Sequence, residues 1–262
     1  MLTFEKELIN IKEITFELTN KCFNNCLHCS TNASSNYNDE LDKLDINIIK
    51  ETIDKYDPEW VNLSGGEPLL YPDIYNLLEY LQTKNVKVKM YTSGDGWWGN
   101  DIKKLSFDKY INTIVFPFYS NRNNIFNFIA NKDLYSTVLS NLRYSLKTNM
   151  NVEVHIVPMT INIYTLEETI DYLINLGVKK INLLKLVNQG RCVNNQYLIL
   201  DDRILKEQMD HLYTKYKDVV KLGLPLSHGK CTAGIEKLVV MCDGKIIPCE
   251  SYKDGVCKCE RI

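Results

Sequence analysis

Features that would direct a protein to a membrane or to nucleic acid are missing from this sequence. No apolar run approaches the roughly eighteen residues of a membrane span. The N-terminal stretch has neither the basic segment nor the long apolar core of a secretory signal. The formal net charge is -2, with no basic stripe, and we find no internal repeat or low-complexity tract. These absences predict a cytoplasmic globular protein with no membrane or nucleic-acid partner.

The 262 residues suffice for one large domain, or for a barrel with a small appendage. Hydrophobic residues make up 45% and charged residues 24%, as in ordinary globular proteins. The nine cysteines are an odd number. In a chain with no visible secretory signal, that count favours metal or redox chemistry over a framework of disulfides.

Hydrophobic periodicity predicts alternating strands and helices. The expected strands are 13–19, 60–63, 86–91, 113–118, 152–157 and 180–187. The expected helices are 46–56 with Asp45 as N-cap, one opened by Pro72 and Asp73, and those at 138–147, 166–176 and 201–217. Strands that alternate with helices in this way indicate parallel βα units.

Three cysteines lie within eight residues, directly after the first strand. Cys22, Cys26 and Cys29 form a C-x3-C-x2-C run. They supply one ligand fewer than the four that an iron-sulfur cube usually takes from its protein. The iron left open is typical of catalytic rather than structural metal sites. Zinc is the alternative, although zinc sites usually recruit a second Cys or His pair; disulfides are the other.

A glycine pair follows the second strand, in the run Ser64, Gly65, Gly66, Glu67, Pro68. Glycine lets backbone groups approach a ligand closely, although such a pair alone is more often just a turn. Taken with the three cysteines, this run resembles the GGEP motif of the radical S-adenosylmethionine (SAM) enzymes. That family carries an aromatic residue before the third cysteine, and His28 fills this place.

The resemblance implies an α/β fold, a partial (β/α)6 TIM barrel over residues 1–222. Cys22, Cys26 and Cys29 would hold a catalytic 4Fe-4S cluster whose fourth iron binds SAM. One electron, from a donor such as flavodoxin or ferredoxin, would cleave SAM to methionine and a 5'-deoxyadenosyl radical. This radical would abstract a hydrogen atom from the substrate.

The implied SAM contacts come from the GGEP motif and from the ends of later strands. Thr92, Ser93 and Gly94 resemble the family's TNG-like turn. The fourth strand lacks the family's Ser-x-Asp ending, and Ser120 is the nearest substitute for the usual ribose contacts. The predicted cofactor-binding residues are Gly65, Gly66, Glu67, His28, Ser93, Ser120 and His155.

Alternation along the strands predicts a polar barrel interior, which suggests a cavity that admits substrate. For each of these residues, a satisfied structural hydrogen bond is the alternative. The inward-facing residues are expected to be Glu17, Asn62, Ser64, Tyr91, Glu153, His155 and Met159. In the loop after the third strand, Trp97 and Trp98 could stack on adenine or a substrate ring, or plug the barrel mouth.

The last part of the chain, residues 223–262, is predicted to be a separate cysteine-rich domain. Apolar runs on either side of Asp243 and Gly244 predict a β-hairpin that brings Cys231 and Cys249 to the same end. The spacing resembles the opening of the SPASM and twitch domains, which hold auxiliary 4Fe-4S clusters. A second cluster would be bound by Cys231, Cys249, Cys257 and Cys259. Cys242 competes with the last two as a ligand, and a zinc knuckle is the alternative.

The resemblance leaves three functions open. The first is modification of a ribosomally made peptide, by a crosslink, a thioether or epimerisation. The second is radical dehydrogenation of a small molecule such as an aminocyclitol. The third is a non-catalytic iron-sulfur module for electron transfer, against which the intact GGEP motif speaks.

Two further expectations bear on the choice. Cys192 follows Gly190 and Arg191, a GR ending often seen after the sixth strand in this family, and its thiol could return a hydrogen atom as in peptide epimerases. A small packed hydrophobe is the alternative.

Only about ten residues precede the first strand. A peptide substrate would then need a separate recognition protein or an exposed sheet edge.

Overall fold

The computed structural model describes residues 10–36, 42–95, 109–227, 229–253 and 255–258. Trp97, Trp98 and Cys259 lie outside the described residues. Within the described part, the strands form one nine-stranded sheet in the order β7-β6-β5-β4-β3-β2-β1-β8-β9. Neighbouring strands are parallel, except that β8 and β9 are antiparallel. The fold is therefore α/β with a mostly parallel sheet, as predicted.

The strands agree closely with the predicted ones up to the fifth. They are β1 Glu13–Glu17, β2 Trp60–Ser64, β3 Lys87–Tyr91, β4 Thr113–Pro117, β5 Asn151–Ile156, β6 Ile181–Leu183, β7 Val220–Leu222, β8 Lys237–Val240 and β9 Ile246–Ile247. The sixth strand is much shorter than the predicted 180–187. Leu184 still donates to the Ile156 carbonyl, but β5 ends there, ahead of Pro158, so no strand remains to pair with.

Helices follow the strands as expected for βα units. They are α1 Ile46–Tyr56, α2 Ile74–Thr83, α4 Asn123–Ala130, α5 Tyr135–Ser145, α6 Leu166–Asn175 and α7 Asp202–Lys215. Short 3-10 helices lie at Pro68–Leu70, Ile163–Thr165, Gly190–Asn194, Gln196–Leu198, Leu224–Leu226 and Glu250–Tyr252. Asp45 caps α1 as predicted, because its carboxylate accepts from the Asn47 amide at 2.8 Å. Helix α4 and strand β7 were not predicted.

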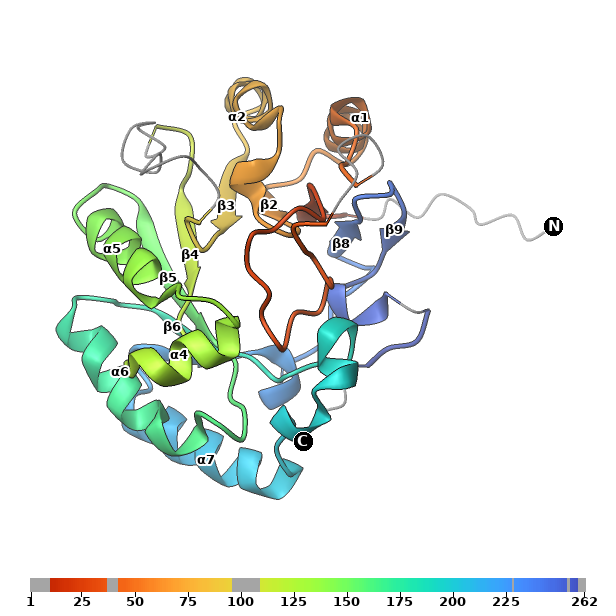
Figure 1. Ribbon diagram of the computed structural model, residues 1–262. Coiled ribbons are helices and arrows are strands. Elements are labelled where there is room, and N and C mark those ends of the chain that lie inside the picture. The colour runs from red at the N-terminus through yellow and green to blue at the C-terminus, as the bar shows by residue number, and fades with distance from the viewer. Residues whose placement is uncertain (1–9, 37–41, 96–108, 228, 254, 259–262) are drawn as a thin grey trace.

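Helices cover the outside of the curved sheet (Figure 1). Figure 1 shows α1, α2, α5, α6 and α7 around the periphery, with the segment between β1 and α1 crossing the centre of the view. Ile14 and Phe16 of β1 are fully buried in one contiguous apolar core with residues of these helices. None of the helices in the described ranges is long and apolar enough to cross a membrane.

The opposite, concave face of the sheet carries polar side chains. Lys89 on β3 reaches Glu153 on β5 across the intervening strand β4. Inward curvature of the sheet, visible in Figure 1, brings such side chains on one face closer together. The predicted polar interior is therefore present, in keeping with an open barrel.

The C-terminal hairpin forms as predicted, with Gly244 in its turn at φ +81°. Its first strand, β8, pairs in parallel with β1, a pairing that was not predicted. The hairpin thus extends the barrel sheet beyond its first strand. The proposed boundary between residues 222 and 223 stays a prediction.

Candidate active site

The glycine pair after β2 lies against the backbone that leads from β1 into the cysteine loop, a name used here for residues 20–34. Gly66 N-H donates to the Thr19 carbonyl at 2.6 Å, and Glu67 N-H donates to the Lys21 carbonyl at 2.8 Å. A Cβ on Gly66 would lie 2.2 Å from the Lys21 oxygen, and Gly65 has φ +125°. Both positions therefore require glycine. The pair allows two backbone segments to approach each other at the barrel mouth.

Glu67 joins the end of β2 to the end of β3. Glu67 is only 2% exposed. Its carboxylate accepts hydrogen bonds from the hydroxyls of Thr92 and Ser93 and from the backbone amides of Leu69 and Ser93. Burial raises the pKa of Glu67, and these hydrogen bonds oppose the rise. Both carboxylate oxygens thus have partners within the protein. A direct SAM contact by Glu67 stays a prediction.

The same network reaches the cysteine loop through Asn24, whose amide donates to the Ser93 hydroxyl at 2.9 Å. The structure thereby brings together Gly65, Gly66, Glu67 and Ser93 with the loop that carries the three cysteines. Thr92 and Ser93 belong to the predicted TNG-like turn, whereas Asn24 was not predicted. Nothing in the local pattern marks Asn24, because its partner Ser93 lies 69 residues away.

The three thiols of the loop are partly buried. The Tyr119 hydroxyl donates to Cys26 Sγ at 3.6 Å, and Cys29 Sγ lies 3.2 Å from the Thr31 hydroxyl. Burial raises the pKa of Cys26 to about 11 and that of Cys22 to about 12. A metal that binds these thiols must therefore displace their protons. In the described part of the chain, no three Cys, His, Asp or Glu side chains converge closely enough to hold a metal ion.

Among the described residues, two buried polar atoms of the cysteine loop have no hydrogen-bond partner, namely Asn24 Oδ1 and His28 Nδ1. Such orphaned atoms are uncommon in folded proteins. The His28 ring packs edge-on against Tyr119, with 4.9 Å between ring centroids. Burial and the nearby Arg191 charge lower the pKa of His28 to about 4, so it is neutral at pH 7. Three thiols on one short loop, too far apart to share a single metal ion, are the donor set of a larger iron-sulfur cluster, and the unsatisfied polar atoms of the same loop can bind a polar ligand.

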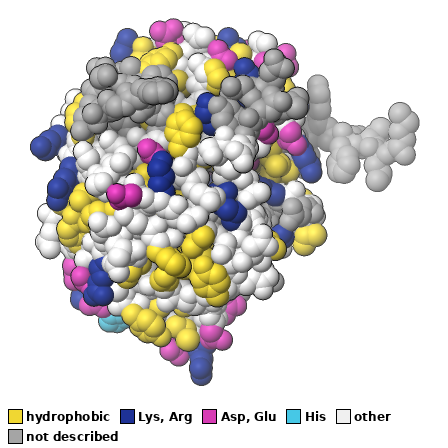
Figure 2. Space-filling model, in the orientation of Figure 1, with side chains coloured by type: hydrophobic (Ala, Val, Ile, Leu, Met, Phe, Trp, Pro, Cys, Tyr) yellow, Lys and Arg dark blue, Asp and Glu magenta, His cyan; other side chains and the backbone are white. Residues whose placement is uncertain are grey.

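The far side of the cysteine loop is held by other elements of the fold. Leu27 N-H donates to the Ile129 carbonyl at the end of α4, at 2.9 Å. Lys132 donates to the Phe23 carbonyl at 3.4 Å and pairs with Asp95. In Figure 1 the loop accordingly spans the centre of the molecule toward α4, and Figure 2 shows acidic and basic side chains interspersed on this face.

The remaining predicted cofactor residues lie on β5 and after β4. His155 is partly buried and packs against Tyr91, at 5.4 Å between ring centroids, and loss of solvent around its ring lowers its pKa to about 4. Ser120 is fully buried, and its hydroxyl accepts from the Arg122 amide at 3.1 Å, just before α4. Neither His155 nor Ser120 makes a hydrogen bond or ring contact with the cysteine loop among the residues that the structure describes. Their SAM-binding roles stay predictions.

Deeper in the barrel, Glu153 accepts from Lys180 at 2.9 Å, from Asn182 at 3.2 Å and from Lys89 at 3.3 Å. Burial alone would raise the pKa of Glu153, but Lys180 and Lys89 outweigh it and lower the pKa. The Asn62 amide donates to Glu13 at 2.6 Å and to Thr15 at 3.1 Å. Glu153 and the Asn62 side-chain amide were expected either to face a substrate cavity or to make structural hydrogen bonds. Both make structural hydrogen bonds.

The tail reaches into this interior, a contact that local sequence patterns could not predict. Lys253 donates to Glu17 on β1, and the two side chains are only 10% and 4% exposed. The Gln189 amide donates to the Glu250 carbonyl at 2.8 Å. Residues 250–253 thus bridge β1 and the segment after β6.

The tail cysteines are less enclosed than those of the loop. Cys231 and Cys257 are exposed and Cys249 is partly buried. A Cβ on Gly234 would lie 3.3 Å from the Pro248 side chain, so the stretches that carry Cys231 and Cys249 are adjacent, as predicted. Cys242 is buried just beyond β8, at the opposite end of the hairpin from Cys249.

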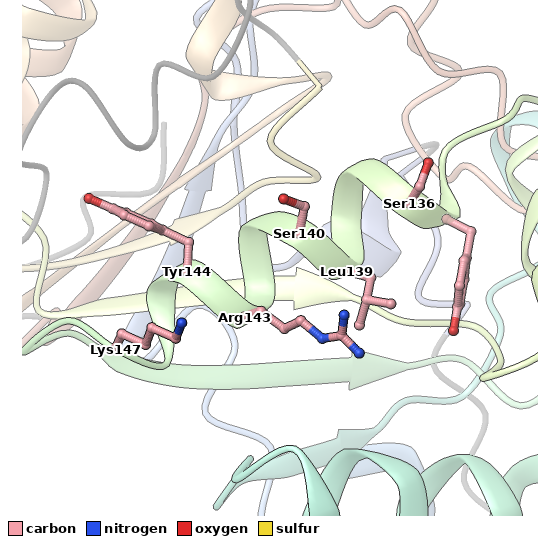
Figure 3. A pocket seen from close by; sticks show the side chains of 7 residues that line it. Ser136, Leu139, Ser140, Arg143, Tyr144 and Lys147 are labelled. Atoms are coloured by element: carbon pink, nitrogen blue, oxygen red, sulfur yellow. The ribbon is translucent and has the colours of Figure 1, made fainter.

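A surface pocket of about 530 Å³ lies away from all of these residues, on α5 (Figure 3). Figure 3 shows its lining side chains projecting from this helix and from the turn directly after it. They are Tyr135, Ser136, Leu139, Ser140, Arg143, Tyr144 and Lys147. The pocket contains none of the predicted site residues, so it is not the site that the motifs indicate.

Curated relatives cover this chain to different extents. The probable GTP 3',8-cyclase of Sulfurisphaera tokodaii is 23% identical, over 94% of this chain and 83% of its own length. The mycofactocin maturase MftC of Mycobacterium ulcerans is 32% identical, over 31% of this chain and 22% of its own length.

Solved structures show the same fold over nearly the whole chain. Streptococcus suis SuiB, in a crystal structure with its precursor peptide SuiA, matches 93% of this chain with a TM-score of 0.71 and 17% identity. This match covers 60% of the SuiB chain, so the present chain spans less than two thirds of that protein. The structure of anSMEcpe with bound AdoMet and a peptide matches 95% of this chain and 76% of its own, with a TM-score of 0.69 and 15% identity.

The sequence profile of the radical SAM superfamily matches residues 16–174, which is more than half of the chain. The match includes the three loop cysteines and the glycine pair whose contacts are described above. It also confirms the family that these motifs predicted. The chain therefore belongs to the radical SAM superfamily and is an enzyme of that family.

Proposed function

We propose that this enzyme modifies a ribosomally made peptide, by crosslinking, thioether formation or epimerisation, in a reaction that starts with reductive cleavage of SAM. The observation that carries the proposal is the fold match to SuiB in complex with its precursor peptide, which extends over 93% of this chain. The structure of anSMEcpe with a bound peptide and the local similarity to MftC point the same way.

Family membership implies a 4Fe-4S cluster and SAM, and when bound these supply the electron transfer and the radical that abstracts a hydrogen atom. In this chain Cys22, Cys26 and Cys29 would hold the cluster. Gly65 and Gly66 keep the turn after β2 against the cysteine loop. Glu67 fixes the turn after β3. His28, Ser93, Ser120 and His155 are proposed to contact SAM or the substrate beside it.

We further propose that the tail binds a second 4Fe-4S cluster through Cys231, Cys249, Cys257 and Cys259. The adjacency of Gly234 and Pro248 supports this, because it brings two of these cysteines to one end of the hairpin. The position of Cys242 at the other end argues against its sharing a cluster with Cys249. A zinc site remains the alternative, and metal analysis distinguishes the two.

A nucleotide substrate is the second candidate, because the similarity to the GTP 3',8-cyclase of Sulfurisphaera tokodaii extends over 94% of this chain. A nucleoside triphosphate needs several cationic side chains to offset its charge. In the described part of the barrel interior, Lys89 and Lys180 are paired with Glu153, and Lys253 is paired with Glu17. The charges of these three lysines are thus already offset in part by carboxylates, which favours the peptide.

The free edges of the sheet bear on how a peptide would be recognised. In the described part of the chain, these edges are β7 and β9, of three and two residues. Edges this short offer few backbone hydrogen bonds to an added strand. We therefore propose a separate peptide-recognition protein, together with an electron donor such as flavodoxin or ferredoxin.

The test is 5'-deoxyadenosine formation by the anaerobically reconstituted enzyme with SAM and dithionite. Peptides from neighbouring reading frames, aminocyclitols and GTP are supplied separately at equal concentration. We expect a peptide to raise the rate above the background without substrate and to change in mass. If only aminocyclitols raise 5'-deoxyadenosine formation, the enzyme is a small-molecule dehydrogenase. If GTP is consumed, its substrate is a nucleotide. The Cys22, Cys26 and Cys29 triple alanine variant is the control for cluster-independent signal.

A further inference from the structure

One segment on the opposite side of the barrel from the glycine pair binds the cysteine loop through its carbonyl groups. Arg191, just after β6, donates from its backbone N-H to the Cys29 carbonyl at 2.9 Å. Its guanidinium donates from Nε to the Cys26 carbonyl at 2.8 Å and from Nη1 to the Ala33 carbonyl at 2.6 Å. A single residue thus binds three carbonyl groups spread over eight residues of the loop.

The neighbours of Arg191 complete this contact. Gly190 has φ +58°, and a Cβ there would lie 2.3 Å from the Cys29 carbonyl oxygen, so the two backbones touch. Asn195 donates to the Leu27 carbonyl at 3.1 Å and to the Arg191 carbonyl at 2.9 Å. Apart from an isolated bridge between Lys21 and Ser34, the loop has no helix or strand of its own and must satisfy its buried backbone groups elsewhere. The segment after β6 supplies donors for four of its carbonyl groups.

The guanidinium also places a positive charge beside a cysteine that is expected to bind the cluster. Among the described residues, no carboxylate pairs with Arg191, in contrast with the exposed Arg122, which pairs with Glu168 at 2.7 Å. A cluster bound by thiolates gains negative charge when it is reduced. A nearby cation stabilises that reduced form, because hydrogen bonds and charge near a cluster set its potential.

We propose that Arg191 is a positioning residue for the catalytic cluster: it holds the cysteine loop in shape before any cofactor binds, and its charge favours the reduced cluster. The second half rests on the proposed function, since it needs a 4Fe-4S cluster at Cys22, Cys26 and Cys29. The first half concerns the protein alone. It can be tested without a cofactor.

The first measurement is the alkylation rate of the loop thiols by iodoacetamide in the apoprotein, followed by peptide mass spectrometry. Arg191→Met should raise the rates at Cys26 and Cys29 several-fold, because the loop loses two guanidinium hydrogen bonds. Arg122→Met, the matched control, should leave the rates unchanged. Unchanged rates in Arg191→Met with an intact circular dichroism spectrum would overturn the positioning role.

The second measurement is the ratio of reduced to oxidised cluster at a fixed solution potential, read by electron paramagnetic resonance. Arg191→Met should lower this ratio on the order of tenfold, as expected for removing one charge near the cluster. Arg191→Lys should restore the ratio while its apoprotein thiols still react faster, because lysine keeps the charge but not the planar fork. A normal ratio in the Met variant, or an equally low ratio in Lys and Met, would refute the electrostatic half.

The Lys variant also serves if the Met variant does not fold. Alkylation rates in Arg191→Lys equal to the wild type would then refute the positioning role. If the wild-type protein binds no 4Fe-4S cluster, the proposed function fails. The alkylation result in the apoprotein would still decide whether Arg191 holds the loop.

Discussion

The cysteine loop exchanges hydrogen bonds with the turn after β2, with α4 and with the segment after β6, whereas two of the tail cysteines lie on exposed stretches. The tail is attached to the barrel mainly through β8 and through residues 250–253. In the loop the protein fixes the backbone before a cofactor binds. The second cluster proposed for the tail would supply much of the geometry there, so cluster binding and folding of the tail should be coupled.

The largest expected effect is on the loop. Replacing Cys22, Cys26 and Cys29 together with Ala should abolish SAM cleavage and leave a folded barrel, because the three thiols are only partly buried and the loop is held largely through its backbone groups. Iron per chain should fall by about half if each site carries one four-iron cluster. The measurements are 5'-deoxyadenosine under dithionite, iron analysis and circular dichroism. Continued 5'-deoxyadenosine production would show that these cysteines do not hold the catalytic cluster.

The matched change in the tail should separate the two regions. Cys231→Ala with Cys249→Ala should spare SAM cleavage without substrate but stop product formation. The reason is that the loop contacts described above involve the barrel and not these two cysteines. Product is measured by mass spectrometry alongside 5'-deoxyadenosine. Anaerobically purified wild-type protein with zinc and only one cluster would contradict the auxiliary-cluster role.

The sequence predicted those features of the fold that depend on residues close together in the chain. Asp45 could be identified as an N-cap because its partner lies two residues away. The length of β6 could not be predicted, because it depends on where β5 ends. The pairing of β8 with β1 depends on the geometry of the whole barrel.

The same contrast holds within the site. The motif spacing identified the loop cysteines and the glycine pair. It could not show that the Glu67 carboxylate binds Thr92 and Ser93 rather than facing a ligand alone. Glu17 and Lys253 are 236 residues apart in sequence, and a single lysine in a polar tail carries no signal of burial.

A smaller effect is expected where the two regions meet. Lys253→Met should destabilise the protein by about 3 kcal/mol, because it leaves the buried Glu17 carboxylate without its cation. Glu17→Gln combined with Lys253→Met should recover much of this loss. Urea unfolding at pH 7 measures both. Equal stability of the Lys253 single variant and the wild type would show that the tail is not anchored at this point.

The pH dependence of that loss follows from Glu17. The pKa of Glu17 is raised on balance, because burial together with the nearby Glu250 and Asp243 charges outweighs the opposing effect of Lys253. A group whose pKa is raised in the folded state gives its full contribution to stability below the unfolded pKa, and loses it as the pH rises through the folded pKa. Removing Lys253 raises the folded pKa further. The cost of Lys253→Met should therefore be larger at pH 7 than at pH 4, and a cost independent of pH would mean that Glu17 does not titrate with folding.

The smallest effect is expected at Cys192, which lies in the segment that holds the cysteine loop. Its side chain is 0% exposed, so a thiol that returns a hydrogen atom to substrate would first have to become accessible. The burial favours the alternative of a packed hydrophobe. Cys192→Ala should then cost about 1 kcal/mol of stability, as for a small core truncation, and leave product formation unchanged. If the variant still makes 5'-deoxyadenosine but forms no product, and incorporates no solvent deuterium into the peptide, Cys192 is the hydrogen donor and the segment after β6 must open during turnover.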